Sequence, residues 1–215
     1  MKINDIIIFG STGSIGTSTL NSIKKRREFR LKLISTNKNA KKILKQAISF
    51  KVKDVVIEDY EVFKKYKDKF NQKKINCHWG HANINKILKK KVSYCVNSIT
   101  GIEGLEPTLK IIPYTKNLLI SNKESIICGW DLIKKKLLKY NTKFIPLDSE
   151  HFSIWKLIKN ENSKNIEKII LTASGGPFLN KSKNKIANIS PNFALKHPNW
   201  KMGKKISIDS STLMN

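Results

Sequence analysis

Residues 6–16, which read IIIFGSTGSIG, decide the fold. The four apolar residues at the start predict a buried strand, and the stretch at residues 17–25 predicts a helix. Glycines lie between them in the spacing G-x-x-G-x-x-G, a variant of the dinucleotide fingerprint. Glycine permits a tight turn and lets backbone N–H groups approach a pyrophosphate at the helix N-terminus. The stretch therefore indicates a dinucleotide site, although a purely structural strand-to-helix turn has the same pattern.

Outward from this stretch, strand-like apolar runs alternate with helical stretches. Strands are expected at residues 29–35, 54–57, 92–96, 118–120, 144–147 and 168–172, and helices at residues 40–50, 61–70, 84–88, 104–112 and 151–158. This alternation favours an α/β fold. We expect residues 1–145 to form a Rossmann-like, mostly parallel sheet with helices on both faces, which serves as the cofactor domain. Residues 146–215 are expected to begin an α+β catalytic domain with the metal and substrate site.

The loop after the second expected strand reads TNKN at residues 36–39. An enzyme that uses NAD commonly has an acidic residue near this position, which holds the ribose 2′-hydroxyl. Here Lys38 and Asn39 are present instead, and a cation beside amides suits the 2′-phosphate of NADP. The loop therefore favours NADPH over NADH, and the alternative is an ordinary polar loop before a helix.

Two carboxylates follow the strand expected at residues 144–147. Asp148 and Glu150 are two positions apart, and in an extended chain such residues point to the same side. Converging carboxylate oxygens suit a hard divalent cation such as Mg²⁺ or Mn²⁺. The alternative is a solvated strand-to-helix turn in which Asp148 or Ser149 caps the helix. The local sequence alone leaves both interpretations open.

Positive charge dominates the composition. The chain has 42 Lys and Arg against 16 Asp and Glu, a formal net charge of +26. Such an excess suits a nucleic-acid-binding protein. The lysines are, however, spread over almost every expected helix, without a recognition motif or interleaved aromatic residues. We interpret most of them as solvated helix faces and a minority as steering groups for phosphorylated ligands, and we predict no nucleic-acid partner.

The apolar runs and the cysteines bear on the compartment. No apolar run reaches membrane-spanning length, and the chain enters its first strand without a signal peptide. The three cysteines have no metal-like spacing and fit a reducing environment. We therefore predict a cytoplasmic protein with no membrane partner. His78, Trp79 and His81 lie in an expected polar connection, and we interpret them as surface or packing residues.

Three further polar stretches suggest ligand contacts. Lys123 and Glu124 follow the strand expected at residues 118–120, and ligands of parallel sheets bind beyond the carboxyl ends of strands. A charged pair there is also typical of a solvated loop. Residues 173–178 read ASGGPF, which suits either a phosphate-binding loop or a tight turn. Residues 197–203 read HPNWKMG, and we interpret them as a lid that shields a reaction from water.

Taken together, these motifs resemble the 1-deoxy-D-xylulose-5-phosphate reductoisomerase family. The resemblance rests on five stretches in order along nearly the whole chain, at residues 10–16, 122–125, 146–151, 174–178 and 197–215. It implies an NADPH-dependent, metal-dependent oxidoreductase and isomerase of non-mevalonate isoprenoid biosynthesis. Such an enzyme rearranges 1-deoxy-D-xylulose 5-phosphate and reduces the product to 2-C-methyl-D-erythritol 4-phosphate. The resemblance also implies a divalent cation (Mg, Mn or Co), a small phosphorylated sugar as substrate, and a homodimer for the full-length chain.

The same resemblance implies roles for single residues. Those implied to bind the cofactor are Thr12, Gly13, Ser14, Ile15, Lys38, Asn39, Asn122, Glu124 and Gly203. Those implied to bind the metal are Asp148 and Glu150. Those implied to bind the substrate are Lys123, Ser149, Glu150, Ser174, His197, Ser210 and Asn215. The implied catalytic set is Lys123, Asp148, Glu150 and His197. Trp200 and Met202 are implied to lie in the loop that closes over the site.

The implied chemistry makes demands on the last motif. A metal chelated by a substrate hydroxyl and carbonyl acidifies the first and polarises the second. Hydride transfer then needs the nicotinamide held against the new aldehyde in a dry site. In the family the last motif continues with Lys-Gly-Leu-Glu, whereas this sequence stops at Asn215. We therefore expect the 215-residue chain to bind Mn²⁺ weakly and to turn over little or no substrate. The alternative function is a truncated remnant that binds NADP(H) without turnover.

Overall fold

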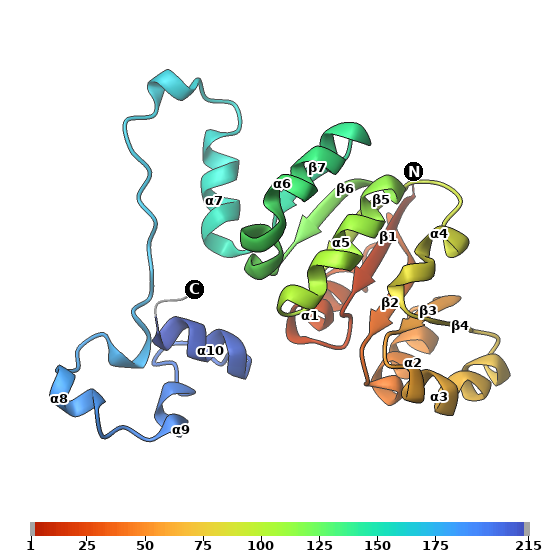
Figure 1. The fold of residues 1–215 in the computed structure, drawn as a ribbon, viewed down its shortest axis with the longest axis horizontal. Coiled ribbons are helices and arrows are strands. Elements are labelled where there is room, and N and C mark those ends of the chain that lie inside the picture. Colours follow the sequence, from red (N-terminus) through yellow and green to blue (C-terminus); the bar gives the residue numbers. More distant parts are fainter. Residues whose placement is uncertain (1–2, 213–215) are drawn as a thin grey trace. The chain divides into compact units, whose positions relative to one another are not determined.

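The structure, a computed structural model, describes residues 3–212 and divides into two compact units (Figure 1). The first unit is Met1–Phe152 and the second is Ser153–Asn215. The division falls a few residues after the boundary expected at residue 145. That expected domain boundary stays a prediction.

The first unit is built on a seven-stranded parallel sheet with the order β4-β3-β2-β1-β5-β6-β7. The strands are β1 (Asn4–Phe9), β2 (Phe29–Thr36), β3 (Asp54–Ile57), β4 (Asn76–Trp79), β5 (Val92–Asn97), β6 (Thr115–Ile120) and β7 (Lys143–Pro146). This architecture confirms the predicted Rossmann-like α/β fold. Because β1 pairs with both β2 and β5, the strand order reverses at β1. Ligands of doubly wound sheets bind at such a reversal, beyond the carboxyl ends of the strands.

Helices cover both faces of this sheet. The helices of the first unit are α1 (Ser14–Ile23), α2 (Ala40–Ser49), α3 (Tyr60–Gln72), α4 (Ile84–Ile87), α5 (Leu105–Ile111) and α6 (Lys123–Lys139). Side chains of α1, α2 and α3 join one hydrophobic core, and side chains of α4, α5 and α6 join a second core. Alternate residues of β1 contribute to the two cores, Ile6 and Ile8 to the first and Ile7 and Phe9 to the second. A strand that is buried on both faces reads as a continuous apolar run, which explains the sequence of β1.

The remaining helices follow β7. They are α7 (Ser149–Ile158), α8 (Lys183–Ile186), α9 (Pro191–Ala194) and α10 (Lys204–Ser211). Only α7 crosses the division between the two units, and the other three lie in the second unit. Both hydrophobic cores consist of residues of the first unit.

Three expectations about elements were wrong. The polar connection that contains His78 and Trp79 forms β4, a partly exposed strand at the edge of the sheet. Residues 123–139 form α6, where no helix was expected, so the alternative of a solvated loop at Lys123 was wrong. Residues 168–172 form no strand, because no strand within residues 3–212 pairs with them. An isolated extended segment has no partner for its backbone N–H and C=O groups, and an apolar sequence alone does not supply one.

Candidate functional site

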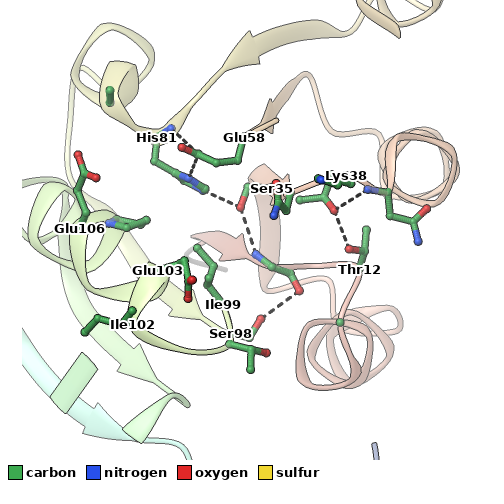
Figure 2. A pocket seen from close by; sticks show the side chains of 18 residues that line it. Thr12, Ser35, Lys38, Glu58, His81, Ser98, Ile99, Ile102, Glu103 and Glu106 are labelled. Carbon is green, nitrogen blue, oxygen red and sulfur yellow. Dashed lines mark hydrogen bonds and ion pairs between the residues drawn. The ribbon is translucent and has the colours of Figure 1, made fainter. Parts of the chain in front are cut away.

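A pocket of about 830 Å³ lies where the strand order reverses (Figure 2). Its walls come from the carboxyl ends of five neighbouring strands. The residues that line it include Gly10 after β1, Ser35 and Lys38 at the end of β2, Glu58 after β3, His81 after β4 and Ser98 after β5. Parallel strands bring these residues together although they are distant in the sequence.

The glycine turn between β1 and α1 forms one wall of the pocket. Gly10 has a φ of +72°, and a side chain at this position would come within 2.8 Å of the Ser98 carbonyl oxygen. Gly16 lies against the same turn, since a Cβ there would be 2.4 Å from the carbonyl oxygen of Gly10. Both positions therefore exclude any side chain, the first also because of its backbone conformation.

The second helix binds the carbonyl groups of this turn. Lys42 Nζ donates to the Thr12 carbonyl oxygen at 2.8 Å, and Gln46 Nε2 donates to the Ser11 carbonyl oxygen at 2.9 Å. Gly13, the N-cap of α1, provides no side-chain hydrogen bond to the first turn of that helix. Ser14 and Ile15, two predicted cofactor residues, begin α1 at this end. The backbone N–H groups of a helix start that lacks a side-chain cap suit a pyrophosphate.

The loop after β2 forms the part of the wall next to the glycine turn. Thr12 and Thr36 share a hydroxyl hydrogen bond of 2.8 Å, and the Asn39 side chain caps α2 by accepting from the Lys42 N–H. The Lys38 side chain is largely exposed, and its Nζ lies 3.4 Å from Asp59 Oδ2. The Val62 backbone N–H, together with Lys38, lowers the pKa of the Asp59 carboxyl below its usual value. The predicted cofactor residues Thr12, Gly13, Lys38 and Asn39 thus line one pocket.

Asn122 supports the pocket from behind. It is only 5% exposed, its Oδ1 accepts from the Ser125 N–H to cap α6, and its Nδ2 donates to the Ile99 carbonyl oxygen at 2.7 Å. Ile99 lines the pocket, whereas Lys123 and Glu124 in the first turn of α6 are not among its lining residues. Asn122 therefore supports the pocket wall through its hydrogen bond to Ile99 and does not line the pocket itself. Its predicted cofactor contact stays a prediction, as does that of Glu124.

The two predicted metal ligands lie at the start of α7. Asp148 caps this helix by accepting from the His151 N–H at 2.9 Å, and it also pairs with the His151 ring. Glu150 is already helical and accepts from the Ser149 hydroxyl at 2.8 Å. The extended-chain reason given for their convergence was therefore wrong, and the helix-cap geometry is present. Within residues 3–212, no group of three or more His, Cys, Asp or Glu is arranged to hold a metal ion.

The second unit brings three predicted substrate residues together. Ser174 Oγ lies 3.0 Å from His197 Nε2 and 2.9 Å from Ser210 Oγ. The backbone N–H groups of Asn199 and Trp200 both donate to His197 Nδ1. Nδ1 therefore accepts, so a neutral ring carries its proton on Nε2 and donates it to Ser174. Hydroxyl and imidazole groups in this arrangement suit a phosphate or a sugar hydroxyl.

Close packing of two segments holds this cluster in place. Gly176 has a φ of +59°, and a Cβ there would be 2.7 Å from the Ser210 carbonyl oxygen of α10. The His197 ring stacks on Trp200 with a centroid distance of 4.7 Å. Gly203, a predicted cofactor residue, is the N-cap of α10. Asn215, a predicted substrate residue, lies outside the described residues.

The sequence did not reveal several residues of the pocket. Ser35, Glu58, His81 and Ser98 line it, and none was among the predicted site residues. His81 is buried, with 5% exposure, which agrees with the packing alternative of the expectation and not with a surface position. The one available signal was position, because each of the four lies at or just beyond the end of a parallel strand.

Burial changes the pKa of two cysteine thiols. Burial raises the pKa of Cys77 to about 12 and that of Cys95 further, so neither is poised to act as a thiolate.

Within residues 3–212, no helix has both the length and the apolar character needed to cross a membrane.

Two protein-family models match the chain. Residues 6–129 match the model described as 1-deoxy-D-xylulose 5-phosphate reductoisomerase, and residues 144–215 match the model of the C-terminal domain of that reductoisomerase. The 1-deoxy-D-xylulose 5-phosphate reductoisomerase of Pelagibacter ubique (strain HTCC1062) is 53% identical over 213 residues, which are 98% of this chain and 55% of the relative. That of Clostridium novyi (strain NT) is 43% identical and is matched over 99% of this chain and 56% of the relative.

Solved structures agree with these sequence matches. The reductoisomerase from Zymomonas mobilis in complex with NADPH matches with a TM-score of 0.86 and 30% identity, over all of this chain and 55% of the other. A DOX-P reductoisomerase in complex with NADPH, fosmidomycin and magnesium matches with a TM-score of 0.89 and 32% identity, over 99% of this chain and 55% of the other. The chain thus spans about half the length of the relatives that it matches.

Proposed function

We propose that this chain, which belongs to the 1-deoxy-D-xylulose 5-phosphate reductoisomerase family, holds NADPH and part of the substrate site for the reaction of that family. The reaction converts 1-deoxy-D-xylulose 5-phosphate to 2-C-methyl-D-erythritol 4-phosphate in non-mevalonate isoprenoid biosynthesis. The observation that carries the proposal is the pocket at the reversal of the strand order, which is lined by both the glycine turn and Lys38.

The residues of the pocket suit NADPH, which supplies a hydride when bound. The start of α1 offers backbone N–H groups to the pyrophosphate, and Lys38 offers a cation to the 2′-phosphate. Gly10 and Gly16 keep side chains out of the turn, so the backbone can approach the cofactor. Structural relatives in complex with NADPH support the same assignment.

Asp148 and Glu150 are proposed to hold a divalent cation, for which Mg²⁺, Mn²⁺ and Co²⁺ are the candidates. Their carboxylates supply anionic oxygens of the kind that hard cations take, and a relative in complex with magnesium supports the assignment. Such a cation polarises a substrate carbonyl and acidifies a hydroxyl. Water and substrate oxygens are expected to complete the coordination.

The remaining predicted residues are proposed to bind the phosphorylated sugar. Ser174, His197 and Ser210 form a hydrogen-bonded cluster that suits a phosphate group. Lys123 and Ser149 are proposed to contact the reacting end of the substrate together with Glu150. Lys123 would stabilise oxyanion charge or relay a proton. Asn215, outside the described residues, stays in the proposed substrate set.

The compartment, the binding partners and the oligomeric state of the protein are also proposals. Free cysteines support a reducing, cytoplasmic compartment, and the partner is a small phosphorylated sugar, with no nucleic acid and no membrane. A homodimer is proposed for the full-length protein.

A second candidate function is binding of NADP(H) without turnover. One observation favours it: both hydrophobic cores and all lining residues of the pocket lie in the first unit, so this unit has a cofactor-sized pocket of its own.

Two measurements on the 215-residue chain test these functions. Fluorescence titration with NADPH and NADH should show saturable binding with a preference for NADPH. Oxidation of NADPH with 1-deoxy-D-xylulose 5-phosphate and Mn²⁺ then separates the two candidates, because only an active reductoisomerase consumes NADPH. Absence of NADPH binding would contradict both functions.

A further inference from the structure

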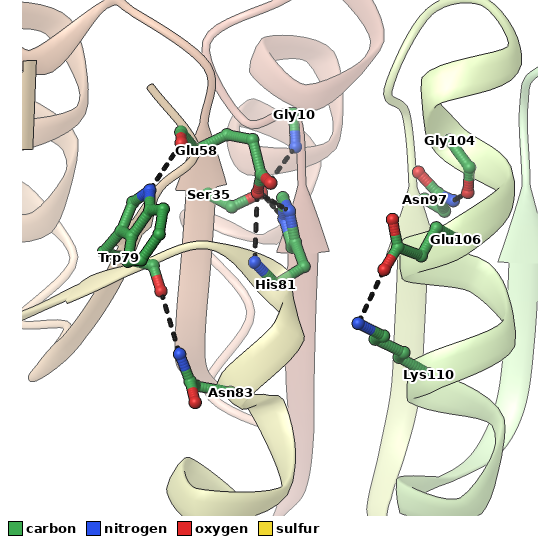
Figure 3. A network of polar contacts seen from close by, with 10 residues as sticks. All are labelled: Gly10, Ser35, Glu58, Trp79, His81, Asn83, Asn97, Gly104, Glu106 and Lys110. Atoms are coloured by element: carbon green, nitrogen blue, oxygen red, sulfur yellow. Dashed lines mark hydrogen bonds and ion pairs between the residues drawn. The ribbon is translucent and has the colours of Figure 1, made fainter. Parts of the chain in front are cut away.

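Four residues from four strand ends form one chain of hydrogen bonds along the wall of the pocket (Figure 3). Glu58 pairs with His81 Nδ1, His81 Nε2 lies 2.8 Å from Ser35 Oγ, and Ser35 Oγ accepts from the Gly10 N–H at 3.1 Å. We call this chain the Glu58–His81–Ser35–Gly10 relay. It ends on the first residue of the glycine turn.

The donors and acceptors of the relay fit in one direction. A carboxylate only accepts, so His81 Nδ1 carries a proton and donates it to Glu58. In a neutral ring Nε2 then accepts from the Ser35 hydroxyl, which leaves the Ser35 oxygen to accept from the Gly10 N–H. The His81 backbone N–H also donates to Glu58, at 3.0 Å, and the Trp79 indole donates to the Glu58 carbonyl oxygen, also at 3.0 Å. The first of these bonds holds the Glu58 carboxylate at the start of the relay, and the second holds the Glu58 backbone.

His81 also contacts the residue just before the turn. Its ring meets the Phe9 ring edge to face, with centroids 4.7 Å apart and planes at 71°. His81 and Ser35 are buried, with 5% and 0% exposure, so water does not substitute easily for the bonds between them. The histidine thus holds the turn at two successive residues, Phe9 by packing and Gly10 through Ser35.

We propose that His81 is a positioning residue for the cofactor. With Glu58 it orients the Ser35 hydroxyl, and that hydroxyl holds the Gly10 amide in the conformation that presents the glycine turn to a pyrophosphate. This role rests on the proposed function, namely that the turn binds NADPH. His81 acts through Ser35 and is not a catalytic residue.

A purely structural role for His81 makes a different prediction. If His81 only fills space, an apolar side chain of similar size replaces it. The relay instead needs a donor toward Glu58 and an acceptor toward Ser35. Glutamine offers both, because its amide nitrogen and oxygen are separated by one carbon, as are the two ring nitrogens of histidine.

The experiment compares His81→Gln and His81→Leu with the parent chain. The matched control is His78→Leu, because His78 forms a similar pair with Asp54 at 2.9 Å on the edge strand and does not line the pocket. The readouts are the exchange rate of the Gly10 amide proton by NMR without ligand, and the affinities for NADPH and for adenosine 2′,5′-bisphosphate. The bisphosphate keeps the 2′-phosphate but lacks the pyrophosphate.

We expect His81→Leu to speed exchange of the Gly10 amide and to weaken NADPH binding by about tenfold, which corresponds to the loss of a buried polar connection. Binding of the bisphosphate should change by less than about twofold, since Lys38 is untouched. His81→Gln should stay within about threefold of the parent for NADPH. The control should match the parent in every readout.

Several outcomes would overturn this role. Equal NADPH affinity and equal Gly10 exchange in His81→Leu and His81→Gln would show that the hydrogen bonds are not needed. An equal loss for both nucleotides would indicate general damage to the domain. If His81→Leu does not fold, Ser35→Ala removes the same link and must produce the same two losses. A parent chain that binds no NADPH overturns the proposed function, and Gly10 exchange then still decides whether the relay holds the turn.

Discussion

At the scale of single residues, Lys38 is expected to set the choice of cofactor. Its ammonium group is largely exposed at the pocket and has Asp59 as its neighbour. Lys38→Met should weaken NADPH binding by about tenfold, because a charged hydrogen bond to the 2′-phosphate is lost. NADH binding should change by less than about twofold, since NADH lacks that phosphate. Fluorescence titration measures both affinities.

Lys41→Met provides the matched control for this change. Lys41 is exposed on α2 and does not line the pocket, so its loss removes the same charge from the same region. Equal weakening of NADPH and NADH by Lys38→Met would mean that Lys38 does not face the 2′-phosphate.

Glu58 should make the stability of the first unit depend on pH. The hydrogen bond from His81 lowers the pKa of the Glu58 carboxyl below its usual value of 4.5. A group with a lowered pKa in the folded state adds stability above its usual pKa, and this stability is lost as the pH falls through the folded value. Relative to Glu58→Gln, the parent should therefore be more stable near pH 7, and its advantage should shrink below about pH 4.5.

Urea unfolding of the parent and of Glu58→Gln at a series of pH values measures this difference. The Glu58 side chain is half exposed, so solvent screens the interaction and the advantage should be below about 1 kcal/mol. An advantage that grows toward acidic pH would contradict the assignment.

Some of these residues were predictable and others were not, for a physical reason. Lys38 and the glycines belong to short local motifs, whose chemistry is visible in a few consecutive residues. His81 and Ser35 are 46 positions apart and meet only because β2 and β4 both end at the pocket. A single sequence does not give the order of strands in a sheet, so this contact was not foreseeable.

At the scale of elements, Gly16 is expected to control the contact between α1 and β1. Helix propensity alone would make Gly16→Ala stabilising by about 1 kcal/mol. The added Cβ would, however, lie 2.4 Å from the Gly10 carbonyl oxygen, which is backbone and has little room to move. We therefore expect destabilisation by about 2 kcal/mol, as for overpacked sites, measured by urea unfolding.

Gly13→Ala is the control in the same turn. A Cβ there would meet only the Gly10 carbonyl oxygen, at 3.4 Å, so the change should cost less than about 1 kcal/mol. A Gly16→Ala chain as stable as the parent would show that the turn relaxes easily.

Asp148 serves α7 as a cap and is proposed to bind a cation, and the two roles can be separated. Asparagine caps a helix about as well as aspartate, so Asp148→Asn should leave the thermal unfolding midpoint unchanged. It should weaken Mn²⁺ binding by about tenfold, because a hard cation prefers an anionic oxygen. Calorimetric titration with Mn²⁺ measures this loss.

Asp148→Ala completes the comparison. This change removes both the cap and the charge, and it should cost about 1 kcal/mol of stability in addition to the loss of Mn²⁺ binding. Unchanged Mn²⁺ affinity in both variants would leave Asp148 as a helix cap alone.

Local sequence predicted elements well where they are buried on both sides and poorly where they are not. The strand at β1 and the helix after it follow from an apolar run and glycine spacing. The edge strand β4 reads Asn-Cys-His-Trp, and its partial exposure leaves no apolar pattern. Residues 168–172 show the reverse case. Their apolar pattern is typical of a strand, but no strand within residues 3–212 pairs with them.

At the scale of the whole molecule, the first unit should bind NADPH alone. Its two hydrophobic cores and the pocket lie entirely within Met1–Phe152. The segment around Lys164 and Lys168 is exposed and should be the first site of tryptic cleavage. The larger fragment should keep its NADPH affinity to within about twofold.

Mass spectrometry identifies the cleavage sites, and fluorescence titration of the purified fragment measures the affinity. A large loss of affinity would contradict the independence of the first unit.

The extended stretch that failed to form a strand has a consequence for how copies of the chain behave together. Ile169, Ile170 and Leu171 are 57%, 70% and 57% exposed, and no strand within residues 3–212 pairs with them. Such a stretch is a template for pairing between molecules. The net charge of +26 opposes that encounter at low ionic strength. Added salt screens charges that are more than about 10 Å apart, so we expect copies of the chain to associate more readily in a high-salt buffer.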